Sequence, residues 1–234
     1  MKYVSVVQHT QSDWLGLIED HLEGRRIRFG YSRPFSAGGS LPKIEVMGDA
    51  LILLGLGPWG AGGTRDVPTL EAERTLARAC LMLEKPIIGF GLGAQILSLA
   101  GDGTVDGAPL SFSAGHASRV QDSALNGYLP ERYPNIVYGF DRAVPPAYAQ
   151  ILAEDDQGYP ALFQIGTTAF GFSGHPGVKL AMIEDLLMES NETPDNTASE
   201  LEKLRALKTP IEDALVSIMT GLVQMTGLMK GQDD

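Results

Sequence analysis

Cysteine is almost missing from this sequence, because Cys80 is the single one among 234 residues. One cysteine cannot form an intramolecular disulfide, and it cannot build a cysteine-based metal cluster. The four histidines are scattered without the close spacing of metal ligands. We therefore expect no metal and no cofactor, and we interpret His9 and His116 as structural or surface residues.

Positive charge is also scarce. Eighteen Lys and Arg residues stand against 29 Asp and Glu residues, which gives a formal net charge of -11. Non-specific binding of nucleic acid needs a cationic face that neutralises phosphates, and an anionic membrane surface attracts the same kind of face. The sequence argues against both partners, and we interpret the acidic surplus as a solvated surface.

Long apolar runs are the third absence. No window approaches the roughly 18 apolar residues that span a bilayer. The segment from Met1 to Gln8 lacks the apolar stretch and the small-residue cleavage site of a signal peptide. A cytoplasmic location is the default expectation.

What is present is typical of one well-buried α/β domain: 44% hydrophobic and 20% charged residues in a chain of 234. Short apolar runs alternate with helical patterns in the first hundred residues, as in an open parallel sheet. The predicted strands are 3–7, 26–29 at an edge, 50–54 and 86–90, and the predicted helices are 13–22, 70–83 and 91–99.

The second half changes character after Gly101. Short β-like runs predict antiparallel strands added to the sheet, at 136–138, 149–153, 161–165 and 168–172. Residues 178–188 predict a helix, 191–198 a polar linker and 210–229 a long helix whose apolar stripe packs on the core. Its methionines leave a groove for a partner as the alternative. We expect one domain over residues 1–190, with 191–234 as a linker and C-terminal helix packed on it or extending it.

The most informative segment runs from Gly89 to Gln95. A strand that enters Gly-x-X-x-Gly and then a helix is the pattern of a nucleophile elbow. The central residue of such a turn, here Gly91, projects over the sheet edge beside a helix N-terminus, where N–H groups can stabilise an oxyanion. A generic glycine turn or a Rossmann phosphate loop is the alternative, but this segment follows a later strand and not the first one.

At this point a resemblance becomes specific. Residues 86–95 resemble the signature of class I glutamine amidotransferases, Gly-x-Cys-x-Gly-x-Gln after a proline and two aliphatics, at every position except the cysteine. Residues 6–9, 54–59 and 171–177 are similar, in order, to the first strand, the Gly-Gly-Pro loop and the Phe-His-Pro-Glu segment of stand-alone, GMP-synthase-like members. The resemblance covers about residues 3–190. It implies a flavodoxin-like, three-layer α/β sandwich with a mostly parallel central sheet.

The family's chemistry implies a role for each matching position. A cysteine attacks the side-chain amide of glutamine, and a histidine, oriented by a glutamate, handles the proton. The resemblance places the nucleophile at Gly91, the base at His175 and the orienting acid at Gly177, so two of the three side chains are missing. Cys80, on the preceding helix, is a small buried hydrophobe rather than a substitute. Ligand contacts are implied at Leu56, Gly57, Leu92 and Gln95.

We therefore expect a catalytically impaired, amidotransferase-like pseudoenzyme that binds a glutamine-like or γ-glutamyl ligand, or a partner protein. In the alternative, the protein is a hydrolase or amidotransferase that uses His175 and a water, with the Leu92 N–H and the Gly57 loop polarising a carbonyl. A third interpretation is a subunit that works with a synthetase. A homodimer is left open.

Overall fold

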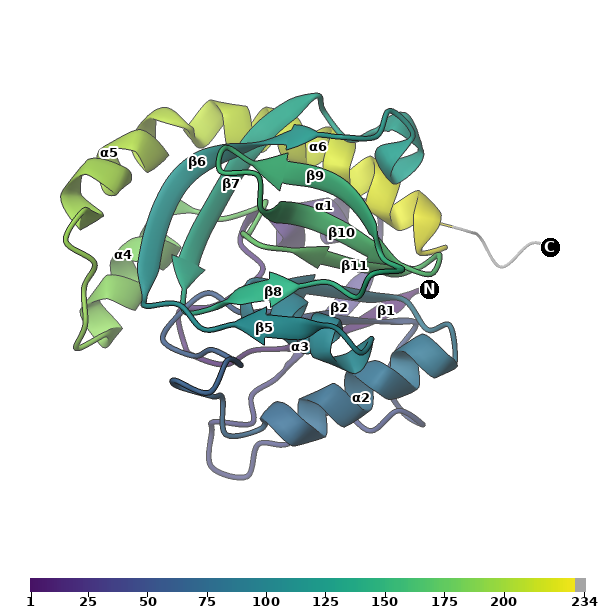
Figure 1. Ribbon diagram of the computed structural model, residues 1–234. Helices are drawn as coiled ribbons and strands as arrows, with labels where there is room; N and C mark the ends of the chain where they lie inside the picture. The colour runs from purple at the N-terminus through teal and green to yellow at the C-terminus, as the bar shows by residue number, and fades with distance from the viewer. Residues whose placement is uncertain (230–234) are drawn as a thin grey trace.

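A computed structural model describes residues 1–229 and is built around two groups of strands (Figure 1). In chain order the strands are β1 (Tyr3–Val7), β2 (Arg28–Ser32), β3 (Ala50–Leu53), β4 (Ile87–Phe90), β5 (Thr104–Asp106), β6 (Ser111–Arg119), β7 (Arg132–Gly139), β8 (Arg142–Val144), β9 (Gln150–Asp155), β10 (Pro160–Ile165) and β11 (Ala169–Phe172). Nine of them form one sheet in the order β2-β1-β3-β4-β11-β10-β9-β6-β7, and β5 pairs with β8 in a separate ribbon.

The sheet has a parallel half and an antiparallel half. Strands β2, β1, β3, β4 and β11 run parallel to one another. Strands β10, β9, β6 and β7 continue the sheet with antiparallel pairings. The predicted α/β fold is confirmed. One expectation was wrong in detail: β11 pairs antiparallel only with β10, and its other neighbour, β4, is parallel because the sheet reverses direction at this strand.

Helices cover both faces of the sheet, as Figure 1 shows. They are α1 (Leu17–Gly24), α2 (Leu70–Met82), α3 (Leu92–Ala100), a 3₁₀ turn η1 (Ala124–Gly127), α4 (Leu180–Glu189), α5 (Thr197–Ala206) and α6 (Lys208–Met225). Ile52 of β3 packs with α1 and α6, whereas its neighbours Leu51 and Leu53 pack with α2 and α3. Successive side chains of a strand point to opposite faces, so two cores form and the molecule has three layers. Helices α4 and α5 pack on β6 and β7 in a third cluster.

Helix α1 begins later than the predicted segment 13–22. Gly16 precedes it with φ 61° and ψ -126°, and the Leu17 N–H donates to the carbonyl of Gly177 at 2.8 Å. Residues 13–15 are therefore held outside the helix by a contact with a segment about 160 residues away. Local periodicity carries no information about such a contact.

The C-terminal segment also differs from its prediction. The expected linker 191–198 ends in α5, which begins at Thr197, and α6 covers 208–225 rather than 210–229. Pro210 lies in the first turn of α6, where no intrahelical partner exists for an N–H, so a proline is tolerated. The stripe that includes Leu215, Ile218 and Leu222 is buried, which confirms that it packs on the core. The domain division at residue 190 stays a prediction, and residues 230–234 of its second part lie outside the described residues.

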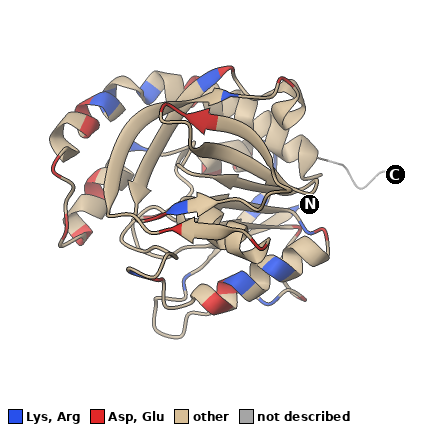
Figure 2. Ribbon diagram, in the orientation of Figure 1, with Lys and Arg blue, Asp and Glu red and all other residues tan. Residues whose placement is uncertain are grey.

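Charged side chains gather on the helices and at strand ends, and the central strands carry few of them (Figure 2). Over residues 1–229, no helix combines the length and apolar character needed to cross a membrane. Cys80 is fully buried on α2, as predicted, and burial raises the pKa of its thiol to about 11.

Candidate functional site

The elbow lies where β4 meets α3, and Gly91 occupies its centre with φ 54° and ψ -113°. This left-handed conformation strains any residue that has a side chain. A Cβ atom added at Gly91 would lie 2.5 Å from the carbonyl oxygen of Gly55, which is backbone and cannot rotate away. Both the conformation and the close approach of the 55–58 loop therefore require glycine at this position.

The two backbone groups expected to stabilise an oxyanion already have partners. The Leu92 N–H donates to the Gly55 carbonyl at 3.2 Å, and the Gly57 N–H donates to the Tyr138 carbonyl at 3.1 Å. An oxyanion hole requires N–H groups aimed at the space where the negative charge develops. Here the same groups hold the loop against the sheet, so neither is free to polarise a substrate carbonyl.

His175 is fully buried, and backbone groups occupy both of its ring nitrogens. Nε2 lies 3.0 Å from the Trp14 carbonyl oxygen, and Nδ1 accepts a hydrogen bond from the Gly177 N–H at 3.2 Å. This pattern fits a neutral ring with its proton on Nε2. Burial lowers the pKa of His175 to about 4 despite the opposing hydrogen bond to Trp14. The ring also packs against Phe90, with 5.1 Å between centroids.

Gly177, the expected position of an orienting acid, has no room for a side chain. A Cβ atom there would lie 2.7 Å from Cγ1 and 3.1 Å from the backbone nitrogen of Ile18. The start of α1 fills this space and is tied to Gly177 by the Leu17 hydrogen bond. The glycine is therefore part of a packed contact between α1 and the loop that carries His175.

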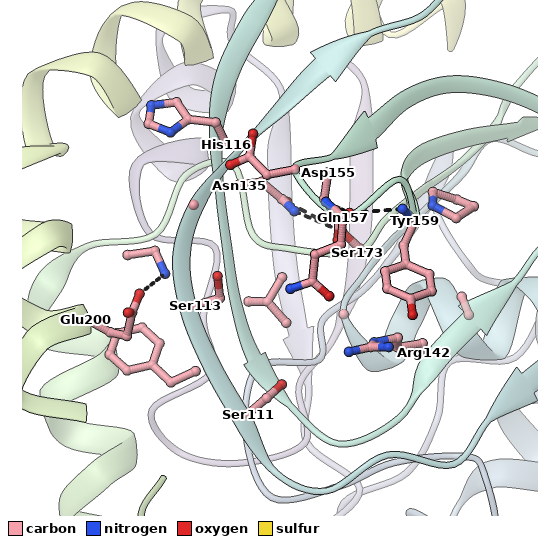
Figure 3. A pocket seen from close by; sticks show the side chains of 18 of the residues that line it. Ser111, Ser113, His116, Asn135, Arg142, Asp155, Gln157, Tyr159, Ser173 and Glu200 are labelled. Atoms are coloured by element: carbon pink, nitrogen blue, oxygen red, sulfur yellow. Dashed lines mark hydrogen bonds between the residues drawn. The ribbon is translucent and has the colours of Figure 1, made fainter. Parts of the chain in front are cut away.

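A cavity of about 450 Å³ opens above the elbow (Figure 3). This volume falls within the usual range for small-molecule sites, roughly 300–1,000 Å³. The sequence-predicted residues divide into two groups by their position. Gly91 and Gln95 line the cavity, whereas Leu56, Gly57, Leu92, His175 and Gly177 do not.

Gln95 is the predicted ligand contact with an unused polar atom. Its side chain is 4% exposed, and Nε2 donates to the carbonyl of Phe140 at 2.8 Å. Its Oε1 has no hydrogen-bond partner among residues 1–229. A buried acceptor without a partner is costly. Less than 1 Å² of this oxygen is accessible, so a ligand reaches it only after the Gln95 side chain moves.

Most of the cavity wall comes from residues that the sequence analysis did not select. Ser111 and Ser113 of β6, Asn135 of β7, Arg142 of β8 and Tyr159 beside β10 face the cavity (Figure 3). The segment Ser111-Phe112-Ser113-Ala114 alternates polar and apolar residues, which is a strand signal. That alternation could have identified β6 and its polar face. The assembly of four separate strands around one cavity has no local signal.

A buried polar cluster lies close to the 55–58 loop. His9 Nε2 lies 2.9 Å from Glu73 Oε2, and the Thr69 hydroxyl donates to the other Glu73 oxygen. Burial acts to lower the pKa of His9, but the hydrogen bond to Glu73 and the charges of Glu73 and Asp13 together raise it. His9 is thus a buried residue paired with Glu73. Among residues 1–229, no group of three or more His, Cys, Asp or Glu side chains is arranged to hold a metal ion.

Comparisons with known proteins point to one fold. No protein-family model matches the chain. The chain is 28% identical over 226 residues to the glutamine-hydrolysing GMP synthase of Aeropyrum pernix; the match covers 88% of this chain and 41% of that protein. The chain therefore spans about two fifths of the length of this curated relative.

Solved structures agree on the architecture. A glutamine amidotransferase from Thermotoga maritima superposes with a TM-score of 0.81 at 19% identity, over 96% of this chain and 98% of that one. A glutamine amidotransferase from Methylobacillus flagellatus gives 0.81 at 20% identity, over 100% and 98%. These likenesses establish the fold that class I glutamine amidotransferases use. Identity this low establishes nothing further.

Proposed function

We propose that this protein is a glutamine amidotransferase-like pseudoenzyme that binds a small amide ligand without hydrolysing it by a cysteine mechanism. The observation that carries the proposal is the elbow itself. Gly91 offers no nucleophile, and the Gly55 carbonyl lies so close that a Cβ atom would meet it at 2.5 Å. The family's reaction begins with attack by that missing side chain.

Three further features support the same proposal. The Leu92 and Gly57 N–H groups are bonded to backbone carbonyls, so charge on a tetrahedral intermediate would find no free donors. His175 has no free ring nitrogen, and Gly177 has no space for an acid. Each of these positions is occupied by packing or hydrogen bonds within the protein.

The direct test is release of glutamate from glutamine by the purified protein. We expect no turnover above the uncatalysed background. Ordinary enzymes turn over at roughly 1–1,000 per second. A rate in that range would overturn the proposal.

Ligand binding is supported by the cavity above Gly91, whose lining includes Gln95 with its unpaired Oε1. Rotation of this side chain would bring the oxygen to an amide or amine N–H of a glutamine-like or γ-glutamyl compound. We expect Gln95→Leu, which keeps the approximate volume, to weaken binding of glutamine in calorimetry. Gln121 is the matched control, because its Nε2 also donates to a backbone carbonyl at 2.8 Å but it does not line the cavity, and Gln121→Leu should bind as the wild type does.

The alternative, hydrolysis by His175 and a water, has less support. Its base lies outside the cavity lining and would have to leave both backbone partners before it could act. If any hydrolytic activity is found, His175→Ala decides its source. Activity that survives this substitution excludes the His175 mechanism.

The partner-binding interpretation is supported by the curated relative. The match covers 41% of a glutamine-hydrolysing GMP synthase, which is therefore much longer than the matched region. We propose a separate synthetase as the partner of this chain. Co-purification of the tagged protein with one defined synthetase in stoichiometric amounts is the expected result, and a lone protein at native expression levels contradicts it.

A further inference from the structure

The charged residues that line the cavity above Gly91 differ in whether they have hydrogen-bond or ion-pair partners. Asp141 is held by three backbone N–H groups, from Ala61 at 3.0 Å, Gly62 at 2.8 Å and Ala108 at 3.0 Å. Its carboxylate is therefore committed to the loops around it.

The other three carboxylates of the lining also have partners. Asp155 accepts two backbone N–H groups of its own turn, each at 2.9 Å. Asp156 pairs with Arg132 at 3.4 Å. Glu200 pairs with Lys203 at 2.7 Å and also accepts the Ala114 N–H at 2.8 Å.

Arg142 is different from these groups. Among residues 1–229 its guanidinium makes no ion pair and no hydrogen bond, and it lies over the ring of Tyr159 at 4.3 Å from the centroid. Figure 3 shows the two side chains together at the cavity wall. Stacking on an aromatic ring holds a guanidinium in one plane but uses none of its five N–H donors. The cavity mouth thus presents one exposed cation that lies on an aromatic ring and pairs with no carboxylate among residues 1–229.

We propose that Arg142 is a specificity-determining residue of this cavity and binds the carboxylate of a small amide ligand. The inference rests on the ligand-binding function proposed above. A planar guanidinium fork matches a planar carboxylate through two parallel hydrogen bonds, which an amide cannot reproduce.

The four carboxylates of the cavity lining disfavour a ligand that carries more than one negative charge. Asp141, Asp155, Asp156 and Glu200 outnumber the cations Arg142 and Lys203. Like charges at short range in a cavity repel one another more strongly than in water. We therefore expect a compound with a single carboxylate, rather than a phosphate or a nucleotide, at Arg142.

The test uses calorimetric titration of the full-length protein with glutaramate, which carries one carboxylate and one amide. Glutaramide, with an amide at both ends, is the uncharged comparison. We expect Arg142→Gln to weaken glutaramate binding about 10- to 100-fold, because a charged hydrogen-bonded pair is lost. Glutaramide binding should not change, and Arg142→Lys should give an intermediate loss.

Arg132→Gln is the matched control, because Arg132 carries the same charge near the same turn but pairs with Asp156. It should bind glutaramate like the wild type. Equal losses for glutaramate and glutaramide in Arg142→Gln, or tighter binding of inorganic phosphate or a nucleoside monophosphate than of glutaramate, overturn this inference alone. Failure of the wild-type protein to bind either amide overturns the ligand-binding function as well.

Discussion

At the scale of single residues, the main feature of the site is two glycines whose neighbours leave no space for a side chain. Gly91 and Gly177 each stand where the resemblance implies a catalytic side chain, and each has a neighbour within 3 Å of the position of a Cβ atom. The sequence revealed the missing side chains. It could not reveal that the Gly55 carbonyl and Ile18 fill their places, because both contacts join segments far apart in the chain.

Restoring the nucleophile should therefore fail. We expect Gly91→Cys to show no glutamate release from glutamine and to lose about 1–3 kcal/mol of unfolding free energy, because a side chain in this left-handed conformation is strained. Urea unfolding and a glutamate assay measure the two effects. Gly24→Ala is the control, since no atom lies within 4 Å of its Cβ position. A stable Gly91→Cys protein with measurable turnover would contradict the account of the elbow.

A second residue-scale prediction concerns Asp13, which is fully buried. Burial raises the pKa of its carboxyl to about 7, although the charge of His9 opposes the shift. The folded state therefore holds this proton more tightly than the unfolded state. The resulting stability is complete below about pH 4, decreases as pH rises toward 7 and is gone above it.

Asp13→Asn removes this titration. We expect the unfolding free energy of the wild type to fall relative to that of Asp13→Asn as pH rises from 4 to 8. The difference between the two proteins should change by about 4 kcal/mol at most. Urea unfolding at several pH values gives the two curves. Asp20→Asn, at an exposed position of α1, is the control. Parallel curves for Asp13→Asn and the wild type would show that Asp13 stays ionised in the folded protein.

At the scale of elements, the loop after β3 is fixed by one side chain from the turn between β7 and β8. Asp141, itself in the left-handed region at φ 60°, accepts N–H groups from residues 61, 62 and 108. We expect Asp141→Asn to cost about 1–3 kcal/mol, since an amide NH₂ group would face backbone N–H groups that need an acceptor. Hydrogen exchange at Ala61 and Gly62 should accelerate.

Asp66 provides the control for that experiment. It lies in the same loop and accepts the Gly63 N–H at 2.7 Å, but it is exposed, so water replaces the lost bond. Asp66→Asn should change neither stability nor exchange at residues 61 and 62. Similar exchange in the two variants would mean that Asp141 does not hold the loop.

Prediction of elements from the sequence succeeded where burial is continuous and failed where tertiary contacts set the limits. Strands β3 and β4 are wholly buried apolar runs, and α2 begins at the predicted residue. The start of α1 depends on Gly177, and α5 has too little apolar periodicity to be separated from a polar linker. The cavity wall was not predicted for a related reason. Its residues come from separate strands that are brought together only in the folded protein.

At the scale of the whole molecule, the last helix is part of the core. Helix α6 buries six apolar side chains against α1, the sheet and the η1 turn: Ile211, Leu215, Ile218, Met219, Leu222 and Val223. Each buried side chain of this size contributes roughly 1.5–3 kcal/mol, so six contribute roughly 9–18 kcal/mol. A domain of this kind has about 5–15 kcal/mol of net stability. Residues 1–207 alone should therefore lack a cooperative unfolding transition in urea.

Two substitutions in the full-length chain distinguish loss of packing by α6 from the effect of shortening the chain. Leu215 is 0% exposed and Val216 is 53% exposed on the same turn of α6. Leu215→Ala should lose about 2–5 kcal/mol of unfolding free energy, and Val216→Ala should lose almost none. If residues 1–207 unfold cooperatively at the midpoint of the full chain, then α6 is an appendage and the division of the chain near residue 190 is a true domain boundary. A noncooperative truncated chain together with a large Leu215→Ala loss makes α6 a part of the single core that supports the cavity.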